Sequence, residues 1–181
     1  MQYNNHDLDF RGGKIKAKYP LMNNLTLIRT DSDQTDFRQL VTQLDKDLAI
    51  RDGDDHAFYS QFNKVDAIKE VVVAYQNEIP TSCGAIKPFS DTTAEIKRMF
   101  VHPDYREQGI ASKILHSLEK WAKELGFTEC ILETGKMQPE AIALYQKVGY
   151  QITPNYGQYM GVDNSVCMKK NLVFKNPALT T

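Results

Sequence analysis

The chain has 181 residues, of which 41% are hydrophobic, and its 22 basic and 23 acidic residues leave a formal net charge of -1. This length and apolar content suffice for one domain with its own core, without disulfides or metals to hold it together. A charge so near zero disfavours general electrostatic binding to nucleic acid or to an anionic membrane. No run approaches the roughly 20 apolar residues of a membrane span. From the charge and the absence of such a run, we expect no nucleic-acid partner, no membrane partner and a cytoplasmic location.

The three cysteines predict buried free thiols. Cys83, Cys130 and Cys167 are odd in number, far apart in the chain and set in apolar runs typical of strands. Such residues behave as small apolar side chains in a reducing compartment. Their spacing is not that of metal ligands, so we expect no metal.

The first half of the chain predicts an extension followed by strands and helices. Residues 1–23 are polar and contain Gly12-Gly13 and Pro20, which indicates an N-terminal extension with little function. Residues Asp31-Ser32-Asp33 offer helix caps before apolar residues that recur at helical spacing. The elements expected up to residue 101 are a strand at 25–30, a helix with Phe37, Leu40, Val41, Leu44 and Leu48 on its apolar face, a loop at 51–55, a short helix at 57–63, and strands at 71–75, 83–87 and 95–101 that form an antiparallel meander.

From residue 109 the apolar period becomes that of a helix. One broad apolar stripe continues until Gly126, a typical C-terminal cap, and indicates a core-facing helix. The stripe consists of Ile110, Ile114, Leu115, Leu118, Trp121, Ala122 and Leu125. A strand at 130–134, a helix from Pro139 to Val148 and a closing strand at 165–172 follow. We expect a single mixed α/β domain over residues 24–173, with a tail at 174–181.

The junction between the strand at 95–101 and the long helix is typical of an anion site. It consists of Arg106-Glu107-Gln108-Gly109-Ile110-Ala111. The first N–H groups of a helix lack intrahelical partners, and the helix dipole adds partial positive charge at the same end. Gly109 lets the backbone approach a ligand closely, and Arg106 can donate a charge-assisted hydrogen bond to a phosphate oxygen. A pyrophosphate fits there, although an ordinary strand-to-helix turn is the alternative interpretation.

Three segments together resemble the GCN5-related N-acetyltransferase (GNAT) superfamily. The junction is similar to its acyl-CoA loop, Gln/Arg-x-x-Gly-x-Gly/Ala. Residues 94–103 resemble its central strand, and residues 140–150 resemble its last helix with a Leu-Tyr pair. The resemblance is clear over about residues 66–171 and extends to 25–65 only by arrangement. It implies an α/β (α+β) fold: a mixed, largely antiparallel central sheet flanked by helices, with a splayed strand pair at the acyl-CoA site.

The resemblance also implies acetyl-CoA as the co-substrate. In the family, backbone groups of the central strand pair with the pantetheine arm, and loop amides meet the phosphates. Gln138 stands where many members carry an asparagine that binds the pantetheine arm. The residues assigned to acetyl-CoA are Met99, Phe100, Val101, Arg106, Glu107, Gln108, Gly109, Ile110, Ala111, Ser112 and Gln138.

Acetyl transfer to an amine takes a proton from the nucleophile and gives one to the departing thiolate. Tyr145 matches the helix tyrosine of the family, which implies that its hydroxyl protonates the thiolate. A phenol with a reference pKa of about 10 keeps its proton at neutral pH. The alternative is a packed tyrosine whose hydroxyl binds water or a neighbour.

Glu95 is the candidate base. It stands six residues before Val101, as the catalytic glutamate does in the histone-acetylating branch of the superfamily. A period of two puts Glu95, Lys97 and Met99 on one face of the strand, and desolvation there would raise the pKa of the carboxyl. An exposed glutamate paired with a basic neighbour is the alternative. Glu133 on the adjacent strand is the second candidate, and many relatives use only water chains.

The expected acceptor is the primary amine of a small molecule or amino-acid-like compound. Acidic residues after the first helix, Asp45, Asp47, Asp52, Asp54 and Asp55, would concentrate a protonated amine, or else form a solvated acidic loop. The acceptor-site candidates are Phe58, Tyr59, Phe62, Asn63, Glu133, Tyr156 and Tyr159. Two other functions stay open: a non-catalytic acyl-CoA-binding or regulatory domain, and a protein or peptide N-acetyltransferase. We expect a monomer or a homodimer.

Overall fold

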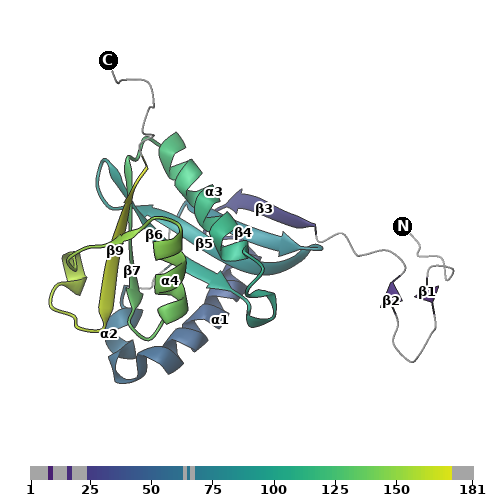
Figure 1. Cartoon of the computed structure of the whole chain (residues 1–181), viewed down its shortest axis with the longest axis horizontal. Helices are drawn as coiled ribbons and strands as arrows, with labels where there is room; N and C mark the ends of the chain where they lie inside the picture. The colour runs from purple at the N-terminus through teal and green to yellow at the C-terminus, as the bar shows by residue number, and fades with distance from the viewer. Residues whose placement is uncertain (1–7, 10–15, 18–23, 63–64, 66–67, 173–181) are drawn as a thin grey trace, which may run out of the picture.

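Figure 1 shows the computed structural model, which describes residues 8–9, 16–17, 24–62, 65 and 68–172. Its main sheet has seven strands in the order β3-β4-β5-β6-β7-β9-β8. These strands are β3 (Leu25–Thr30), β4 (Glu70–Gln76), β5 (Ile79–Pro88), β6 (Thr93–Val101), β7 (Glu129–Gly135), β8 (Gln151–Ile152) and β9 (Ser165–Asn171). Every neighbouring pair is antiparallel except β6 and β7, which are parallel. The mixed, largely antiparallel sheet is therefore confirmed.

The N-terminal part of the chain contributes one further strand pair. Strand β1 (Leu8–Asp9) pairs antiparallel with β2 (Lys16–Ala17). The rest of the predicted extension at 1–23 and the whole tail at 174–181 lie outside the described residues. The boundaries of the predicted domain therefore stay predictions.

Helices cover both faces of the main sheet (Figure 1). The helices are α1 (Thr35–Asp52), α2 (His56–Ser60), α3 (Ile110–Glu124) and α4 (Pro139–Lys147), and the short 3-10 turns are η1 (Gly53–Asp55), η2 (Pro103–Tyr105) and η3 (Gly157–Tyr159). Along β4, Val72 and Ala74 pack into the cluster of α3 and α4, whereas Val71 and Val73 pack into the cluster of α1. Both faces of the strand are buried, which explains its unbroken apolar sequence.

The start and the end of α1 differ from the prediction. Its N-cap is Gln34, whose Oε1 accepts a hydrogen bond from the Phe37 N–H at 2.6 Å. Asp31 instead closes a turn, because its Oδ1 accepts from the Asp33 N–H at 2.9 Å. The helix also continues to Asp52, so the predicted loop at 51–55 shrinks to the 3-10 turn η1.

The apolar stripe of α3 is buried along most of its length. Gly109 at φ +73° precedes the helix, and Gly126 at φ +93° follows it, as the cap signals predict. Leu125 is the exception at 48% exposed, because it lies beyond the last helical residue. All three cysteines are buried and free, as predicted.

A β-bulge interrupts β6 at Arg98 and Met99, which together oppose Gly84 of β5. Arg98 has a φ of +57°, in a left-handed region that few residues other than glycine adopt. Gly84 provides the room that the bulge needs, since a Cβ there would lie 2.5 Å from the Met99 Sδ.

The bulge inverts the alternation of side chains along the rest of β6. Met99 packs into the cluster of α3, whereas Lys97 lies on the other face, with its Nζ 3.4 Å from the Tyr159 hydroxyl. The prediction that Met99 shares a face with Glu95 and Lys97 is therefore wrong, because one extra residue shifts a period of two by one position.

Strands β6 and β7 separate beyond their first three residue pairs. Pairing runs only from Thr93–Glu129 to Glu95–Ile131. Past this point β6 stays paired with β5, and β7 stays paired with β9. A wedge therefore opens between the two strands, and the expected splayed pair is confirmed.

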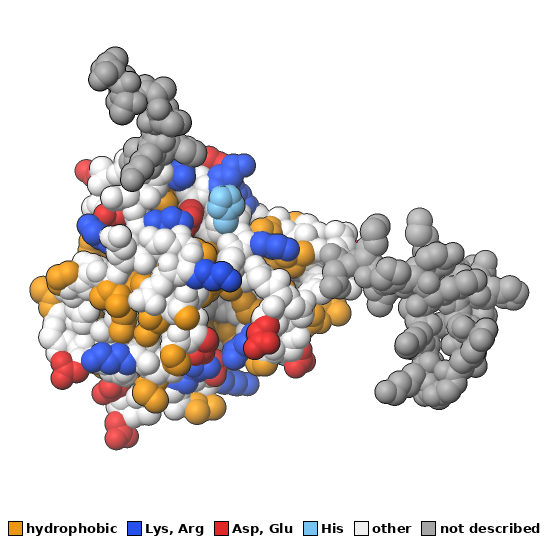
Figure 2. Space-filling view, in the orientation of Figure 1, with side chains coloured by type: hydrophobic (Ala, Val, Ile, Leu, Met, Phe, Trp, Pro, Cys, Tyr) orange, Lys and Arg blue, Asp and Glu red, His pale blue; other side chains and the backbone are white. Residues whose placement is uncertain are grey.

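The surface carries charges of both signs. Figure 2 shows Lys and Arg side chains mixed with Asp and Glu side chains over one face of the molecule. Within the described parts of the chain, no helix has the length and apolar character of a membrane span. Nor do three or more His, Cys, Asp or Glu side chains of those parts gather in a way that could hold a metal ion.

Candidate active site

A cavity of about 580 Å³ lies beside the open end of β6, between α1, α4 and the start of α3. Its wall includes every residue predicted to hold acyl-CoA except Gln108, whose side chain accepts a hydrogen bond from Gln76 at 3.4 Å. The predicted residues in the wall are Met99, Phe100, Val101, Arg106, Glu107, Gly109, Ile110, Ala111, Ser112 and Gln138. We call this space the large cavity.

The start of α3 gives the large cavity a wall that is suited to an anion. The first-turn residues Ile110, Ala111 and Ser112 have N–H groups without intrahelical acceptors, and the helix dipole adds partial positive charge. A Cβ added to Gly109 would meet no atom within 4 Å, so this position borders open space.

Ion pairs connect the elements around the large cavity. The Arg106 Nε donates to the Val101 carbonyl at 3.1 Å, and its Nη2 lies 3.4 Å from the Asp47 Oδ2 of α1. Asp47 also accepts from the Arg51 Nε at 3.2 Å, and the Arg51 Nη1 lies 2.6 Å from the Glu140 Oε1 of α4. The sequence assigned no role to Arg51 or Glu140, and its only signal was the four-residue spacing of Asp47 and Arg51.

A second cavity of about 80 Å³ lies in the wedge between β6 and β7, closed by the end of α1. We call it the small cavity. Its charged and hydroxyl-bearing lining residues are Asp52, Tyr59, Lys97, Arg98, Glu133, Thr134 and Tyr145. The two cavities adjoin, because Leu44, Leu48, Met99, Gln138 and Tyr145 line both.

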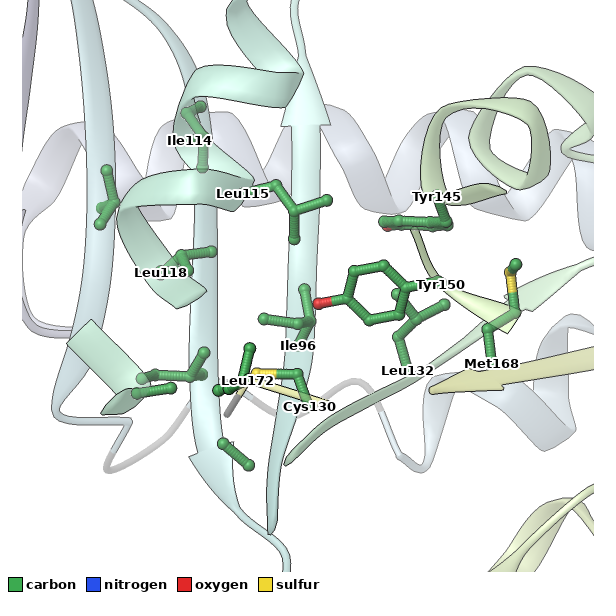
Figure 3. Packing of buried hydrophobic residues seen from close by; sticks show 14 of the residues in the cluster. Ile96, Ile114, Leu115, Leu118, Cys130, Leu132, Tyr145, Tyr150, Met168 and Leu172 are labelled. Atoms are coloured by element: carbon green, nitrogen blue, oxygen red, sulfur yellow. The ribbon is translucent and has the colours of Figure 1, made fainter. Parts of the chain in front are cut away.

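Tyr145 stands at the junction of the two cavities. Figure 3 shows it beside Tyr150, and their ring centroids lie 5.8 Å apart. Burial raises the pKa of the Tyr145 hydroxyl above that of an ordinary phenol, so it keeps its proton at neutral pH. No described residue forms a hydrogen bond with this hydroxyl, which leaves it able to donate to a ligand. Beside it, the Gln138 Oε1 accepts from the Thr134 hydroxyl at 3.2 Å.

Glu133 places a carboxyl in the small cavity. The Ser165 hydroxyl donates to its Oε1 at 2.7 Å. Burial raises the pKa of Glu133 to about 7, with smaller contributions from the charges of Asp52 and Glu95, while Ser165 and Lys97 act in the opposite direction. This carboxyl therefore gains and loses a proton near neutral pH.

Glu95 lines neither cavity. Its Oε1 accepts from the Tyr156 hydroxyl at 3.2 Å and lies 3.5 Å from the Lys97 Nζ. The Glu95 carboxylate therefore contacts Tyr156 and Lys97 and does not face either cavity.

The aromatic acceptor-site candidates form one packed cluster. Phe58, Tyr59, Phe62, Tyr156 and Tyr159 contact one another, with neighbouring ring centroids 5.2 to 6.0 Å apart. Of these five, Tyr59 alone lines one of the two cavities described here, with its hydroxyl 3.0 Å from the Ser165 Oγ. Asn63 lies outside the described residues.

The acidic residues after the first helix have different environments. Asp45 pairs with the Arg98 guanidinium at 2.7 Å, and Asp47 pairs with arginines of the large cavity. Asp52 lines the small cavity, whereas Asp54 and Asp55 are exposed on η1. One of the five therefore reaches the wedge.

Comparison with known proteins identifies the family. The model of the acetyltransferase (GNAT) family matches residues 35–150. The chain belongs to the GNAT acetyltransferase family. This GNAT protein is 32% identical over 157 residues to the IAA acetyltransferase of Azospirillum brasilense, a match that covers 83% of this chain and 100% of that protein. It is 28% identical to YjgM, an uncharacterised N-acetyltransferase of Escherichia coli, over 76% of this chain and 85% of the relative.

Solved structures share the GNAT fold. A candidate acyl-CoA N-acyltransferase of Klebsiella pneumoniae superposes with a TM-score of 0.70 at 25% identity, covering 82% of this chain and 98% of that one. A GNAT acetyltransferase of Elizabethkingia anophelis, solved with acetyl-CoA bound, has a TM-score of 0.59 at 19% identity, over 82% and 98% of the two chains. The GNAT protein described here is an acetyl-CoA-dependent acyltransferase, with acetyl-CoA as its co-substrate.

Proposed function

We propose that this GNAT protein transfers the acetyl group of acetyl-CoA to the primary amine of a small-molecule or amino-acid-like acceptor, through a single domain over residues 24–173. The supporting observation is the pair of adjoining cavities. The large one has an anion-binding helix start, the small one holds a carboxyl, and a protonated tyrosine stands between them.

The large cavity suits acetyl-CoA, which supplies the acetyl thioester. The N–H groups of Ile110, Ala111 and Ser112 would hold the diphosphate. The backbone of Met99 to Val101 lacks a strand partner on the β7 side and would pair with the pantetheine arm. Gln138 would contact the same arm near the junction.

Glu133 and Tyr145 carry the two proton transfers in this proposal. Glu133 accepts the proton of the ammonium, directly or through water, because its pKa of about 7 leaves a substantial ionised fraction at neutral pH. Tyr145 donates to the departing thiolate. We assign the base to Glu133 and not to Glu95, since Glu95 lines neither cavity and is held by Tyr156.

The volume of the small cavity favours a small acceptor over a protein. The small cavity has a volume of about 80 Å³, against about 580 Å³ for the large cavity that it adjoins. Such a space takes an amine and a few attached atoms. The protonated tyrosine and the titrating carboxyl also favour catalysis over a purely acyl-CoA-sensing role.

The test follows CoA release from acetyl-CoA with a panel of amines, amino acids and peptides. Tyr145→Phe should lower turnover by about 10² to 10⁴ while CoA affinity stays within about threefold, because only the proton donor is removed. Tyr150→Phe is the matched control, since it removes a hydroxyl from a neighbouring buried ring that lines neither cavity. CoA binding without turnover of any panel member would contradict the proposal and favour a sensing role.

A further inference from the structure

The walls of the small cavity carry opposite charges. Lys97 and Arg98 come from β6, whereas Glu133 comes from β7 and Asp52 from the end of α1. Because β6 and β7 diverge beyond Glu95–Ile131, the basic strand and the acidic strand lie on the two sides of the wedge. A ligand in this wedge meets cations on one side and carboxylates on the other.

Of the two cations, Lys97 is the one placed to bind a ligand. The Arg98 guanidinium is engaged by Asp45 at 2.7 Å. The Lys97 Nζ forms an ion pair with the Glu95 Oε1 at 3.5 Å and lies 3.4 Å from the Tyr159 hydroxyl, and both distances exceed the usual hydrogen-bond range of 2.7 to 3.2 Å. An ammonium has three N–H donors, so Lys97 can direct one at a further acceptor in the cavity.

The acidic wall is suited to an ammonium group. Asp52 has a side chain that is only 6% exposed, and its neighbour is the His56 Nδ1 at 3.6 Å. Glu133 adds a second carboxyl with a single hydroxyl donor. A simple cationic amine would satisfy this wall but would also be repelled by Lys97, which lines the same small space.

We propose that the acceptor carries a carboxylate beside its primary amine, as a free α-amino acid does, and that Lys97 binds this carboxylate while Glu133 and Asp52 receive the amine. This inference rests on the proposed N-acetylation and narrows its substrate class. A peptide is excluded from this class, because its N-terminal amine has no adjacent carboxylate.

The experiment compares kcat/KM for three matched acceptors: an amino acid, its carboxamide and the corresponding decarboxylated amine. The small cavity calls for small members such as glycine, alanine and serine with their derivatives. We expect the amino acid to be preferred over its carboxamide at least tenfold, because the carboxamide cannot form the charge-assisted hydrogen bond. This difference in kcat/KM between the amino acid and its carboxamide should arise mainly from KM.

Three substitutions test the residue. Lys97→Met should abolish the preference, and Lys97→Arg should retain much of it, because the cation is kept. Lys97→Met alone leaves the Glu95 carboxylate without its cation, which could impair folding. Lys97→Met combined with Glu95→Gln removes both charges, and this double variant should also lose the preference for the amino acid. The loss then reflects recognition of the acceptor and not a folding defect. Lys169→Met is the control, since Lys169 is half exposed, pairs with Glu129 and lines neither cavity.

Each outcome has a distinct meaning. Equal efficiency for the amino acid and its carboxamide in the unsubstituted protein overturns the inference and leaves the N-acetylation standing. A preference that survives Lys97→Met in a folded protein overturns the role of Lys97. Absence of turnover with every acceptor refutes the proposed function itself, and the inference with it.

Discussion

Replacement of Glu133 by Gln should make the protein more stable and less active. Its pKa is about 7 in the folded chain against an ordinary value of 4.5, so the folded state binds this proton more tightly than the unfolded state does. A raised carboxyl pKa gives a stabilising contribution that is complete below the unfolded pKa and is lost as pH rises through the folded pKa. At 1.36 kcal/mol per pKa unit, the loss is about 3 kcal/mol.

Gln cannot ionise, yet its side-chain oxygen can still accept the hydrogen bond from Ser165. The gain in unfolding free energy of Glu133→Gln over the natural chain should therefore be close to zero at pH 4, about 2 kcal/mol at pH 6 and about 3 kcal/mol at pH 8. For a chain of this length, about 3 kcal/mol raises Tm by roughly 6 to 12 °C. Thermal unfolding at these three pH values measures the difference.

The same variant should lose the pH dependence of the reaction. The activity of the unsubstituted enzyme should rise with pH around a midpoint of about 7, as Glu133 loses its proton, whereas Glu133→Gln should fall by about 10² to 10⁴ and lack this midpoint. Glu129→Gln on the same strand is the control, because its partner Lys169 is half exposed and such pairs contribute about 1 kcal/mol or less. A stability gain that is equal at pH 4 and pH 8 would refute the reasoning.

Three further outcomes are expected. Gly109→Asp should weaken CoA binding, measured by calorimetry, at least tenfold more than Gly109→Ala does. Both variants share the strain of φ +73°, but only Asp adds negative charge at the start of α3. Equal losses of affinity would count against the anion site. Gly84→Ala should lower the unfolding free energy, measured by urea denaturation, by about 1 to 3 kcal/mol, because the added Cβ would overlap Met99. An unchanged urea midpoint would show that the bulge can relax. Asp52→Asn should raise KM for the acceptor to a similar extent at low and at high ionic strength, because salt screens a buried charge little. The paired change Asp54→Asn with Asp55→Asn, on the exposed η1, should leave KM unchanged, and an equal rise in KM would place acceptor capture on the outer loop.

Local signals in the sequence predicted most of the fold. The strand at 25–30 has the predicted bounds, and the glycines on both sides of α3 mark its ends, because each signal acts within a few residues. The cap of α1 was missed because Gln34 competes with three better capping types directly before it. The side-chain oxygen of Gln34 reaches Phe37 only through its longer chain.

Which side chains enter the site depended on features that no local pattern records. The bulge at Arg98 shifts the alternation of β6, so Met99 leaves the face that Lys97 keeps. The choice of Glu133 over Glu95 as the candidate base follows from where β6 and β7 stop pairing, which is a property of two strands far apart in the chain. The predicted acyl-CoA loop is one contiguous segment, and all of its residues except Gln108 line the large cavity, while their contact with acyl-CoA stays a prediction.

Because Asp47 already pairs with Arg106, a ligand in the large cavity must compete with this carboxylate for the guanidinium. A ligand with one negative charge gains little by taking the guanidinium from Asp47, because it replaces one ion pair with an equivalent one. A diphosphate brings additional charge and additional acceptor oxygens, so it can engage Arg106 and the N–H groups of α3 together. In the proposed binding mode, the carboxylate of Asp47 therefore competes with the ligand for Arg106, and a diphosphate competes better than an anion with a single charge.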